Sequence, residues 1–171
     1  MTGEEPRARH FAPVADARTR VLILGSLPGV ASLAAGQYYA HPRNGFWRLV
    51  GGVIGADLAA LPYPARLDAL RAAGIGLWDV VGSATRRGSL DQAIRDPEFA
   101  DLAGLVATLP DLRAIAFNGA TAARHGRARL ADLWPGERAP DLLALPSSSP
   151  AHTLPLAEKA RRWDALREYL G

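Results

Sequence analysis

The sequence contains no cysteine among its 171 residues. That absence excludes disulfide bonds, cysteine-ligated zinc and iron–sulfur clusters. The histidines are few and scattered, and no two have the four-residue spacing that puts both on one helix face: His10, His41, His125 and His152. We therefore predict neither a metal site nor a cofactor.

Long hydrophobic runs are also missing. No apolar stretch approaches the roughly twenty residues that a membrane-spanning helix needs. The charged segment 1–20 lacks the apolar centre of a secretory signal, so we expect a cytoplasmic protein. With 171 residues, 49% of them hydrophobic, the chain has enough apolar material for one compact domain over 1–171. Segment 1–14 is expected to pack loosely or fray.

Lysine is nearly absent: of the 20 Lys and Arg residues, only Lys159 is a lysine. The planar guanidinium of arginine makes bidentate contacts with phosphates, which suits a nucleic-acid partner. A coding bias towards alanine and arginine accounts for the composition equally well, and the formal net charge is only +3. The charge balance is therefore compatible with nucleic-acid binding but does not establish it.

Four short apolar runs rich in β-forming residues predict buried strands at 20–24, 76–81, 114–117 and 141–145. Helical patterns lie between and after them, at 45–54, 65–72, 99–108, 119–133 and 156–170. This alternation predicts an α/β fold, a three-layer α/β/α sandwich around a mostly parallel four-stranded sheet. Ligands of such sheets bind beyond the carboxyl ends of the strands.

The segment richest in polar and aromatic side chains follows the first predicted strand. Residues 25–29 (Gly-Ser-Leu-Pro-Gly) form a turn sequence, and five such side chains then crowd into seven residues: Tyr38, Tyr39, His41, Arg43 and Asn44. Aromatic rings next to Arg and Asn suit a nucleobase, which needs a stacking surface and hydrogen bonds at its edge. The alternative is a glycine turn followed by an aromatic loop that opens a core helix. A phosphate loop is excluded, because no Walker lysine follows and the glycine spacing fits no dinucleotide motif.

These motifs resemble the uracil-DNA glycosylase superfamily. The turn at 25–29 and the stretch 37–47 (Gln-Tyr-Tyr-Ala-His-Pro-Arg-Asn-Gly-Phe-Trp) are similar to its first motif, most closely in the hypoxanthine-DNA (deoxyinosine) glycosylase branch. Further similar segments follow in order at 77–81, 88–91, 117–119 and 147–150. The resemblance implies a monofunctional DNA glycosylase that flips out a deaminated base, hypoxanthine before uracil, and removes it by hydrolysis in base excision repair. It also implies double- or single-stranded DNA as partner, a monomer, and association with the nucleoid through DNA.

The resemblance implies Asn44 as the catalytic residue. Mismatch-specific enzymes carry the water-positioning Asn third in the turn, where this chain has Leu27, and the hypoxanthine branch shares that loss. Cleavage passes through an oxocarbenium-like state, so a water must be placed against the sugar carbon. The Asn44 carbonyl would orient that water; the alternative role is a helix N-cap.

Base binding is expected from Tyr39 and Asn118, with Ser26 and Leu27 of the turn beside them. Tyr39 would stack on the flipped base, unless it is ordinary aromatic core. The Asn118 amide offers a donor and an acceptor to the N1–H and O6 edge of hypoxanthine or the matching edge of uracil. Its alternative role is that of a turn residue in an Asn-Gly step.

DNA binding is expected from the second motif and its neighbours. The hydroxyls of Ser147, Ser148 and Ser149 would hold backbone phosphates, unless they form a serine turn without further function; Arg43 and His152 would add contacts. The wedge that fills the vacated base stack is either His152 or the run at 154–156 (Leu-Pro-Leu). Asp79 is either a pocket residue or a structural hydrogen-bond partner.

A glycosylase that also nicks the strand needs an amine, and Lys159 matches no catalytic position, so we predict base removal without strand cleavage.

Three alternatives stay open or are disfavoured by the residues. A uracil or mismatch glycosylase differs in pocket width, which a sequence does not give. A non-catalytic damaged-DNA binding module would have lost the amides at Asn44 and Asn118, and both are present. An enzyme of free nucleosides would carry ribose-binding carboxylates, and residues 25–45 contain none.

Overall fold

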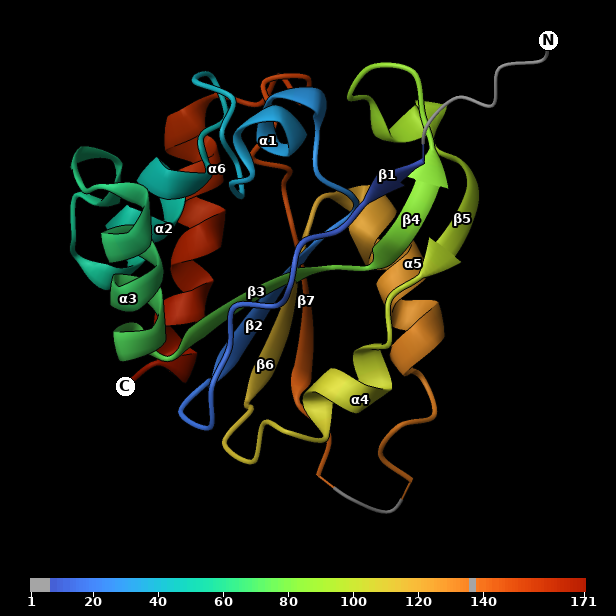
Figure 1. Ribbon diagram of the computed structural model, residues 1–171. Helices are drawn as coiled ribbons and strands as arrows, with labels where there is room; N and C mark the ends of the chain where they lie inside the picture. Colours follow the sequence, from blue (N-terminus) through green and yellow to red (C-terminus); the bar gives the residue numbers. More distant parts are fainter. Residues whose placement is uncertain (1–6, 136–137) are drawn as a thin grey trace, which may run out of the picture.

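The computed structural model describes residues 7–135 and 138–171. A parallel sheet forms the middle layer (Figure 1), with the strands in the order β3-β2-β6-β7. Their bounds are Val21–Gly25 (β2), Ile75–Asp79 (β3), Ala114–Asn118 (β6) and Asp141–Leu145 (β7). The predicted four-stranded parallel sheet is therefore confirmed.

Helices cover both faces of this sheet, which explains why β2, β3 and β6 are buried along their whole length and apolar except for Asp79 and Asn118 at the ends of β3 and β6. Alternate residues of β2 enter different cores: Val21 and Ile23 face one, Leu22 and Leu24 the other. In Figure 1 the first face carries α2 (Phe46–Ile54), α3 (Tyr63–Ala73) and α6 (Leu156–Trp163), and the second carries α4 (Leu102–Val106) and α5 (Ala120–Leu130). The short helix α1 (Val30–Ala35) lies beyond the carboxyl edge of the sheet (Figure 1). None of the helices in the described ranges is long and apolar enough to span a membrane.

Gly126 lies at a close contact between α5 and the sheet, and Gly126→Ala is expected to destabilise the protein. A Cβ atom at this position would overlap the Phe117 ring of β6. Such overpacking lowers the free energy of unfolding by about 1–3 kcal/mol, which exceeds the gain in helix propensity. Urea denaturation measures the difference.

Gly52 in α2 is the matched control, because it is exposed and a Cβ there would contact nothing within 4 Å. Gly52→Ala is expected to raise the free energy of unfolding by about 0.5–1 kcal/mol through helix propensity alone. Equal effects of the two substitutions would contradict the assigned packing of α5.

A second sheet, which the sequence did not predict, lies beside the first. It is antiparallel, in the order β1-β4-β5, with β1 at Ala8–Arg9, β4 at Val81–Thr85 and β5 at Arg95–Phe99. The single strand expected over 76–81 is therefore wrong: β3 ends at Asp79, where the N–H groups of Val80 and Val81 turn to the carbonyls of Gly25 and Ser26 at 2.8 and 2.9 Å. The chain then leaves the parallel sheet as β4.

Three of the expected helices are several residues shorter than predicted. The helix predicted over 99–108 spans only Leu102–Val106, because Phe99 belongs to β5 and the Asp101 carboxylate caps the helix at the N–H of Gly104, at 3.0 Å. The helix predicted over 156–170 changes to a 3₁₀ helix at Asp164–Tyr169. The helix predicted over 119–133 ends at Leu130.

The expectation of a loose segment over 1–14 is wrong for residues 7–14, and residues 1–6 lie outside the described residues. β1 pairs with β4, and Val14 forms a bridge with Leu77 of β3. The Phe11 carbonyl accepts a hydrogen bond from the Trp78 indole at 2.8 Å. This segment therefore joins the two sheets.

Candidate active site

The carboxyl ends of the parallel strands border a cavity of about 510 Å³, a volume typical of small-ligand sites, which span about 300–1,000 Å³. All of the predicted site residues except Arg43 line it: Ser26, Leu27, Tyr39, Asn44, Asn118, Ser147, Ser148, Ser149 and His152. Segments distant in sequence thus meet where the sheet topology predicted a ligand.

Asn44 stands just before α2, on the wall of the cavity, and is half-buried. Its Oδ1 accepts a hydrogen bond from the Phe46 N–H at 3.0 Å, and its own N–H donates to the His41 carbonyl at 2.9 Å. The helix N-cap itself is Gly45, so Asn44 supports the start of α2 from one residue further out. The bond to Phe46 fixes the carboxamide and leaves one lone pair on Oδ1. The water-positioning role stays a prediction that this geometry permits.

Tyr39 adopts φ of 53°, a conformation that is strained for a side chain with a Cβ. Its ring stacks on Phe46, with centroids 3.8 Å apart and planes inclined by 13°. One ring face is therefore covered by the core, as the alternative interpretation expected, and stacking on a base stays a prediction for the other face. Burial, helped by the charge of Asp79, raises the pKa of the Tyr39 hydroxyl, with the Asn118 side chain opposing the shift.

Asn118, at the end of β6, is buried, and its side chain both donates a hydrogen bond to Ser148 and accepts one from it. Its Nδ2 donates to Ser148 Oγ at 2.9 Å, and its Oδ1 accepts from the Ser148 N–H at 2.9 Å. The next residue, Gly119, has φ of 98°, which a turn here requires. The structure thus gives Asn118 a structural role that sequence reasoning missed: it joins β6 to the loop after β7. One N–H and one lone pair remain, and its base-reading role stays a prediction.

The turn after β2 is held by carboxylate and backbone contacts. Ser26 Oγ donates to Asp91 Oδ1 at 2.6 Å, and Arg86 donates to the Pro28 carbonyl. Leu27 lines the cavity but also packs in a small apolar cluster with Val81. The sequence placed Asp91 only within a matching segment, and its contact with Ser26, across 65 residues, had no local signal.

Asp79, whose role the sequence left open, lies at the floor of the cavity at the end of β3 and is only 4% exposed. A Cβ on Gly25 would lie 2.6 Å from Asp79 Oδ1 and 2.9 Å from the Tyr39 hydroxyl oxygen. Both polar groups therefore converge on the space that the missing side chain of Gly25 leaves free. Within the described part of the chain, neither Asp79 Oδ2 nor the Tyr39 hydroxyl has a hydrogen-bond partner.

Burial raises the pKa of Asp79 to about 7, from an ordinary value of 3.8. The negative charge of Asp91 raises this pKa further, and the nearby Arg86 guanidinium partly opposes the shift. A carboxyl group with this pKa exchanges its proton near neutral pH, which is a property typical of functional sites.

The serine loop after β7 uses its hydroxyls internally. Ser147 Oγ accepts from the Ser149 N–H at 3.1 Å, and Ser149 Oγ accepts from the Ala151 N–H at 3.2 Å. These bonds form the serine turn that was the alternative to phosphate binding. Each hydroxyl keeps its own hydrogen, so phosphate binding by the loop stays a prediction.

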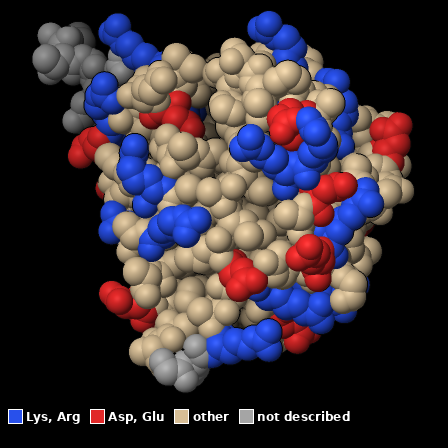
Figure 2. Space-filling view, turned by 180° about the vertical axis from the view of Figure 1, so that it is seen from behind, with Lys and Arg blue, Asp and Glu red and all other residues tan. Residues whose placement is uncertain are grey.

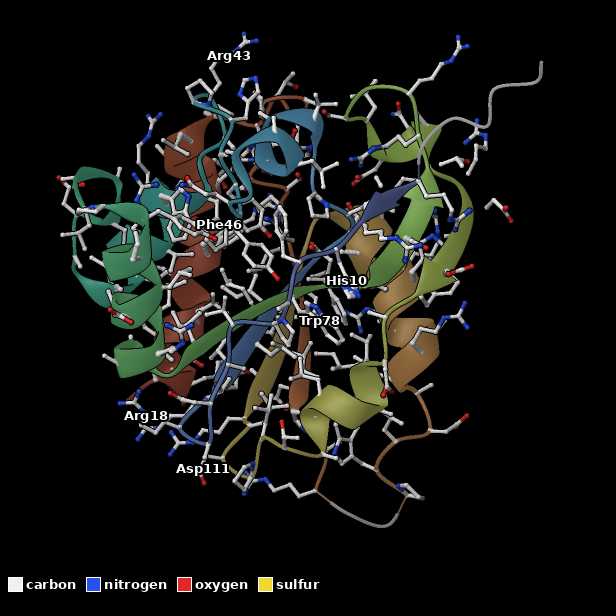
Figure 3. The ribbon with its side chains drawn as sticks, in the orientation of Figure 1. His10, Arg18, Arg43, Phe46, Trp78 and Asp111 are labelled. Atoms are coloured by element: carbon white, nitrogen blue, oxygen red, sulfur yellow. The ribbon has the colours of Figure 1, made fainter. Side chains whose placement is uncertain are left out.

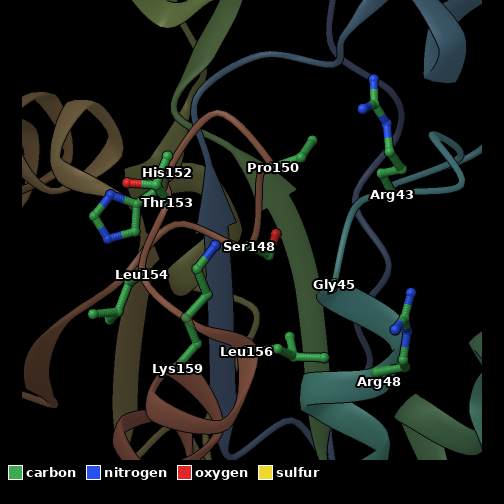
Figure 4. A pocket seen from close by; sticks show the side chains of 10 residues that line it. All are labelled: Arg43, Gly45, Arg48, Ser148, Pro150, His152, Thr153, Leu154, Leu156 and Lys159. Atoms are coloured by element: carbon green, nitrogen blue, oxygen red, sulfur yellow. The ribbon is translucent and has the colours of Figure 1, made fainter.

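A second cavity, of about 270 Å³, adjoins the first through Ser148, Pro150 and His152. Figure 4 shows Arg43, Arg48 and Lys159 around it. Buried Lys159 donates from Nζ to the Ser149 carbonyl at 3.1 Å, and burial lowers its pKa. Sequence reasoning found no catalytic match for Lys159 and missed its position beneath the serine loop.

The two candidate wedges lie at different places around the cavities. His152 is exposed and lines both cavities, while the run at 154–156 lines only the second one.

On the opposite side of the molecule from the view of Figure 1, acidic and basic side chains are interspersed (Figure 2). Over residues 7–135 and 138–171, no group of three His, Asp or Glu side chains is placed to hold a metal ion.

A family model of the uracil DNA glycosylase superfamily matches residues 12–170. The chain belongs to the uracil DNA glycosylase superfamily. The family and the fold class predicted from the motifs are thereby confirmed.

Two curated relatives of this superfamily member are named hypoxanthine DNA glycosylase. The Methanosarcina barkeri protein is 48% identical over 109 residues, which cover 64% of this chain and 69% of the relative. The Methanosarcina acetivorans protein is 46% identical over 117 residues, which cover 68% and 74%. A solution NMR structure from M. acetivorans, described as a candidate uracil DNA glycosylase, superposes with a TM-score of 0.82 at 39% identity, over 96% of this chain and 99% of that one.

Proposed function

We propose that this member of the uracil DNA glycosylase superfamily is a monofunctional DNA glycosylase that removes hypoxanthine from DNA. The observation that carries the proposal is the larger cavity at the carboxyl edge of the sheet, which brings together Asn44, Tyr39 and Asp79. The names of the two relatives support a glycosylase that acts on a deaminated base. A flipped nucleotide would enter this cavity with its base towards the floor.

Hydrolysis of the glycosidic bond needs a base that can leave and a water molecule positioned next to C1′. The C1′–N9 bond breaks with both electrons leaving on the base, and the water oxygen forms a new bond to C1′. One water hydrogen stays on the new 1′-hydroxyl, and the other is released and ultimately protonates the base. Asn44 orients the water by accepting its hydrogen bond, since an amide is no base at neutral pH. Buried polar groups around the base stabilise the charge that develops on it.

The second cavity supports backbone binding. Arg43 and Arg48 stand at its wall with Lys159, beside the site of base entry (Figure 4). Cations in this position would contact the phosphates next to the flipped nucleotide, and binding would weaken as salt rises. The Lys159 amine lines this cavity and not the base cavity, which supports base removal without strand cleavage.

The proposal extends to the setting of the enzyme. We propose that the protein acts as a monomer. The enzyme would act in the cytoplasm, associated with the nucleoid through DNA.

A second candidate function is removal of uracil, alone or from mismatches. It is favoured by the M. acetivorans NMR structure, whose protein is described as a candidate uracil DNA glycosylase. Uracil presents the same N–H and carbonyl edge as hypoxanthine, on a smaller ring. The two functions differ in which base the cavity positions productively.

A single-turnover assay on labelled duplexes that contain inosine or uracil tests the proposal. We expect the inosine strand to break only after alkali is added, because base removal leaves an intact abasic strand. Cleavage of uracil alone would support the second candidate, and breakage without alkali would contradict the monofunctional mechanism. Binding without cleavage of either duplex would make the protein a damaged-DNA binding module.

A further inference from the structure

The floor of the base cavity holds an unusual concentration of polar atoms without partners. Over the described residues, the buried side-chain atoms without a hydrogen bond are Tyr39 Oη, Asp79 Oδ2, and Nε and Nη1 of Arg86. All of them belong to groups at or next to this floor, since Arg86 interacts with the charge of Asp79. Folded proteins rarely leave buried polar atoms unpaired, and such atoms at a cavity indicate groups that a ligand satisfies.

Gly25 leaves space beside two of these groups. The absent Cβ would overlap Asp79 Oδ1 at 2.6 Å and the Tyr39 hydroxyl at 2.9 Å, so any larger residue would displace both. The three residues come from β2, β3 and the loop before α2, and all line the cavity. The Tyr39 hydroxyl and the Asp79 carboxyl group therefore border the same small space next to Gly25.

Asn118, the base reader that the family resemblance implied, is partly engaged by another residue. Both of its amide groups bond to Ser148, at 2.9 Å each. Releasing either bond would detach the serine loop from β6. Asn118 keeps one N–H and one lone pair beside the Tyr39 hydroxyl, while Asp79 Oδ2 forms no hydrogen bond within the described residues.

We propose that Asp79, in its neutral form, binds the N–H and carbonyl edge of the flipped base, with the Tyr39 hydroxyl as a second donor to the carbonyl. This inference rests on the proposed function. A neutral carboxyl group has one donor and one acceptor, which pair with O6 and N1–H of hypoxanthine. An ionised carboxylate has acceptors only, and would leave O6 facing a negative charge.

The protonation state of Asp79 then controls activity. Its pKa is raised to about 7 by burial and by Asp91, against the opposing charge of Arg86. The titratable side chains that line the cavity with Asp79 are Asp91, Tyr38, Tyr39, His41 and His152. Because the neutral form binds the base, cleavage at subsaturating enzyme falls as pH rises through the pKa of Asp79.

The test compares inosine with nebularine, the purine nucleoside that lacks both O6 and N1–H, in single-turnover assays. For the wild type, we expect the second-order rate constant on inosine to fall about tenfold between about pH 6 and pH 8. Asp79→Asn keeps a donor and an acceptor but cannot ionise, so its rate should be level over that range. Asp79→Ala should lose about 10–100-fold on inosine and little on nebularine, so the preference for inosine disappears.

Two further variants keep the test decisive. Tyr39→Phe retains the ring stack on Phe46 but not the hydroxyl, and should reduce the inosine preference several-fold even if Asp79→Ala folds poorly. Asp111→Asn is the control, because Asp111 is exposed at the opposite end of the molecule from Arg43 (Figure 3). It should keep both the pH decline and the inosine preference of the wild type.

The outcomes separate the two proposals. If the wild type releases a base from neither the inosine nor the uracil duplex, the proposed function fails. If it cleaves inosine, but Asp79→Asn declines with pH as the wild type does, another cavity group such as His41 or His152 is responsible and the assignment to Asp79 is wrong. Equal losses of Asp79→Ala on inosine and nebularine would show a structural role only.

Discussion

Replacing Asn44 by alanine is expected to lower the single-turnover rate of base release from an inosine duplex by about 10²–10³-fold. The expected loss is large because no other amide or carboxylate in the turn at 25–29 can take over the water, Leu27 standing where relatives carry an Asn. The rate is measured at saturating enzyme, so that weaker DNA binding does not contribute. Binding of the duplex should change little.

Asn44 also supports α2, and the two roles need to be separated. Its bond to the Phe46 N–H, at 3.0 Å, contributes about 1 kcal/mol to folding stability by the usual value of such contacts. Asn44→Ser offers a hydroxyl to the same N–H, but this shorter side chain does not reach the water site. We expect Asn44→Ser to restore the stability that Asn44→Ala loses while staying inactive. Full activity of Asn44→Ser would reduce Asn44 to a structural support of α2.

The parallel sheet could be predicted because its signal is local. Strands β2 and β6 are continuous apolar runs, and a strand buried on both faces shows this pattern in the sequence alone. Helical segments alternate with the strands, and this alternation predicts parallel pairing. In a parallel sheet the ligand cavity is expected at the carboxyl ends of the strands. Motif resemblance then supplied the residues along its wall.

The second sheet could not be predicted for the opposite reason. Strand β5 has the sequence Arg-Asp-Pro-Glu-Phe and is mostly exposed, so it shows no alternation of apolar and polar residues, and proline argues against a strand. Strand β4 follows β3 after one residue, and nothing in the run 76–85 marks the break at Val80. That break is set by bonds to Gly25 and Ser26, far away in sequence.

The sequence predicted which residues line the cavity better than it predicted their interactions. The sequence brought Asn118 to the site but did not show that Ser148, 30 residues on, occupies its amide. It named Asp79 without choosing a role, because the burial that raises its pKa comes from the packing of several segments. Three-dimensional contacts decide which polar groups are engaged and which stay free for a ligand.

Asp79→Asn is expected to stabilise the protein increasingly as pH rises, in the absence of DNA. The pKa of Asp79 is about 7 in the folded protein against an ordinary 3.8. Between these values the folded state keeps a proton that the unfolded state releases, so the stability of the wild type falls with rising pH. Each pH unit in that window costs about 1.4 kcal/mol, so the advantage of Asp79→Asn should grow by up to about 3 kcal/mol from about pH 5 to pH 7. Above pH 7 it should level off.

Urea denaturation of both proteins at several pH values between about 5 and 8 measures this difference, and Asp16→Asn is the matched control. Hydrogen bonds from Arg18 lower the pKa of Asp16, so its carboxylate contributes stability that is lost only as pH falls below this window. Asp16→Asn should therefore lose stability by the same amount throughout. A pH-independent difference for Asp79→Asn as well would mean that Asp79 is ionised in the folded protein over the whole range. In that case the neutral carboxyl that the base-binding inference requires would not exist. A growing difference would show that the fold tolerates a destabilising group at the floor of its cavity, as expected of a residue retained for its ligand rather than for stability.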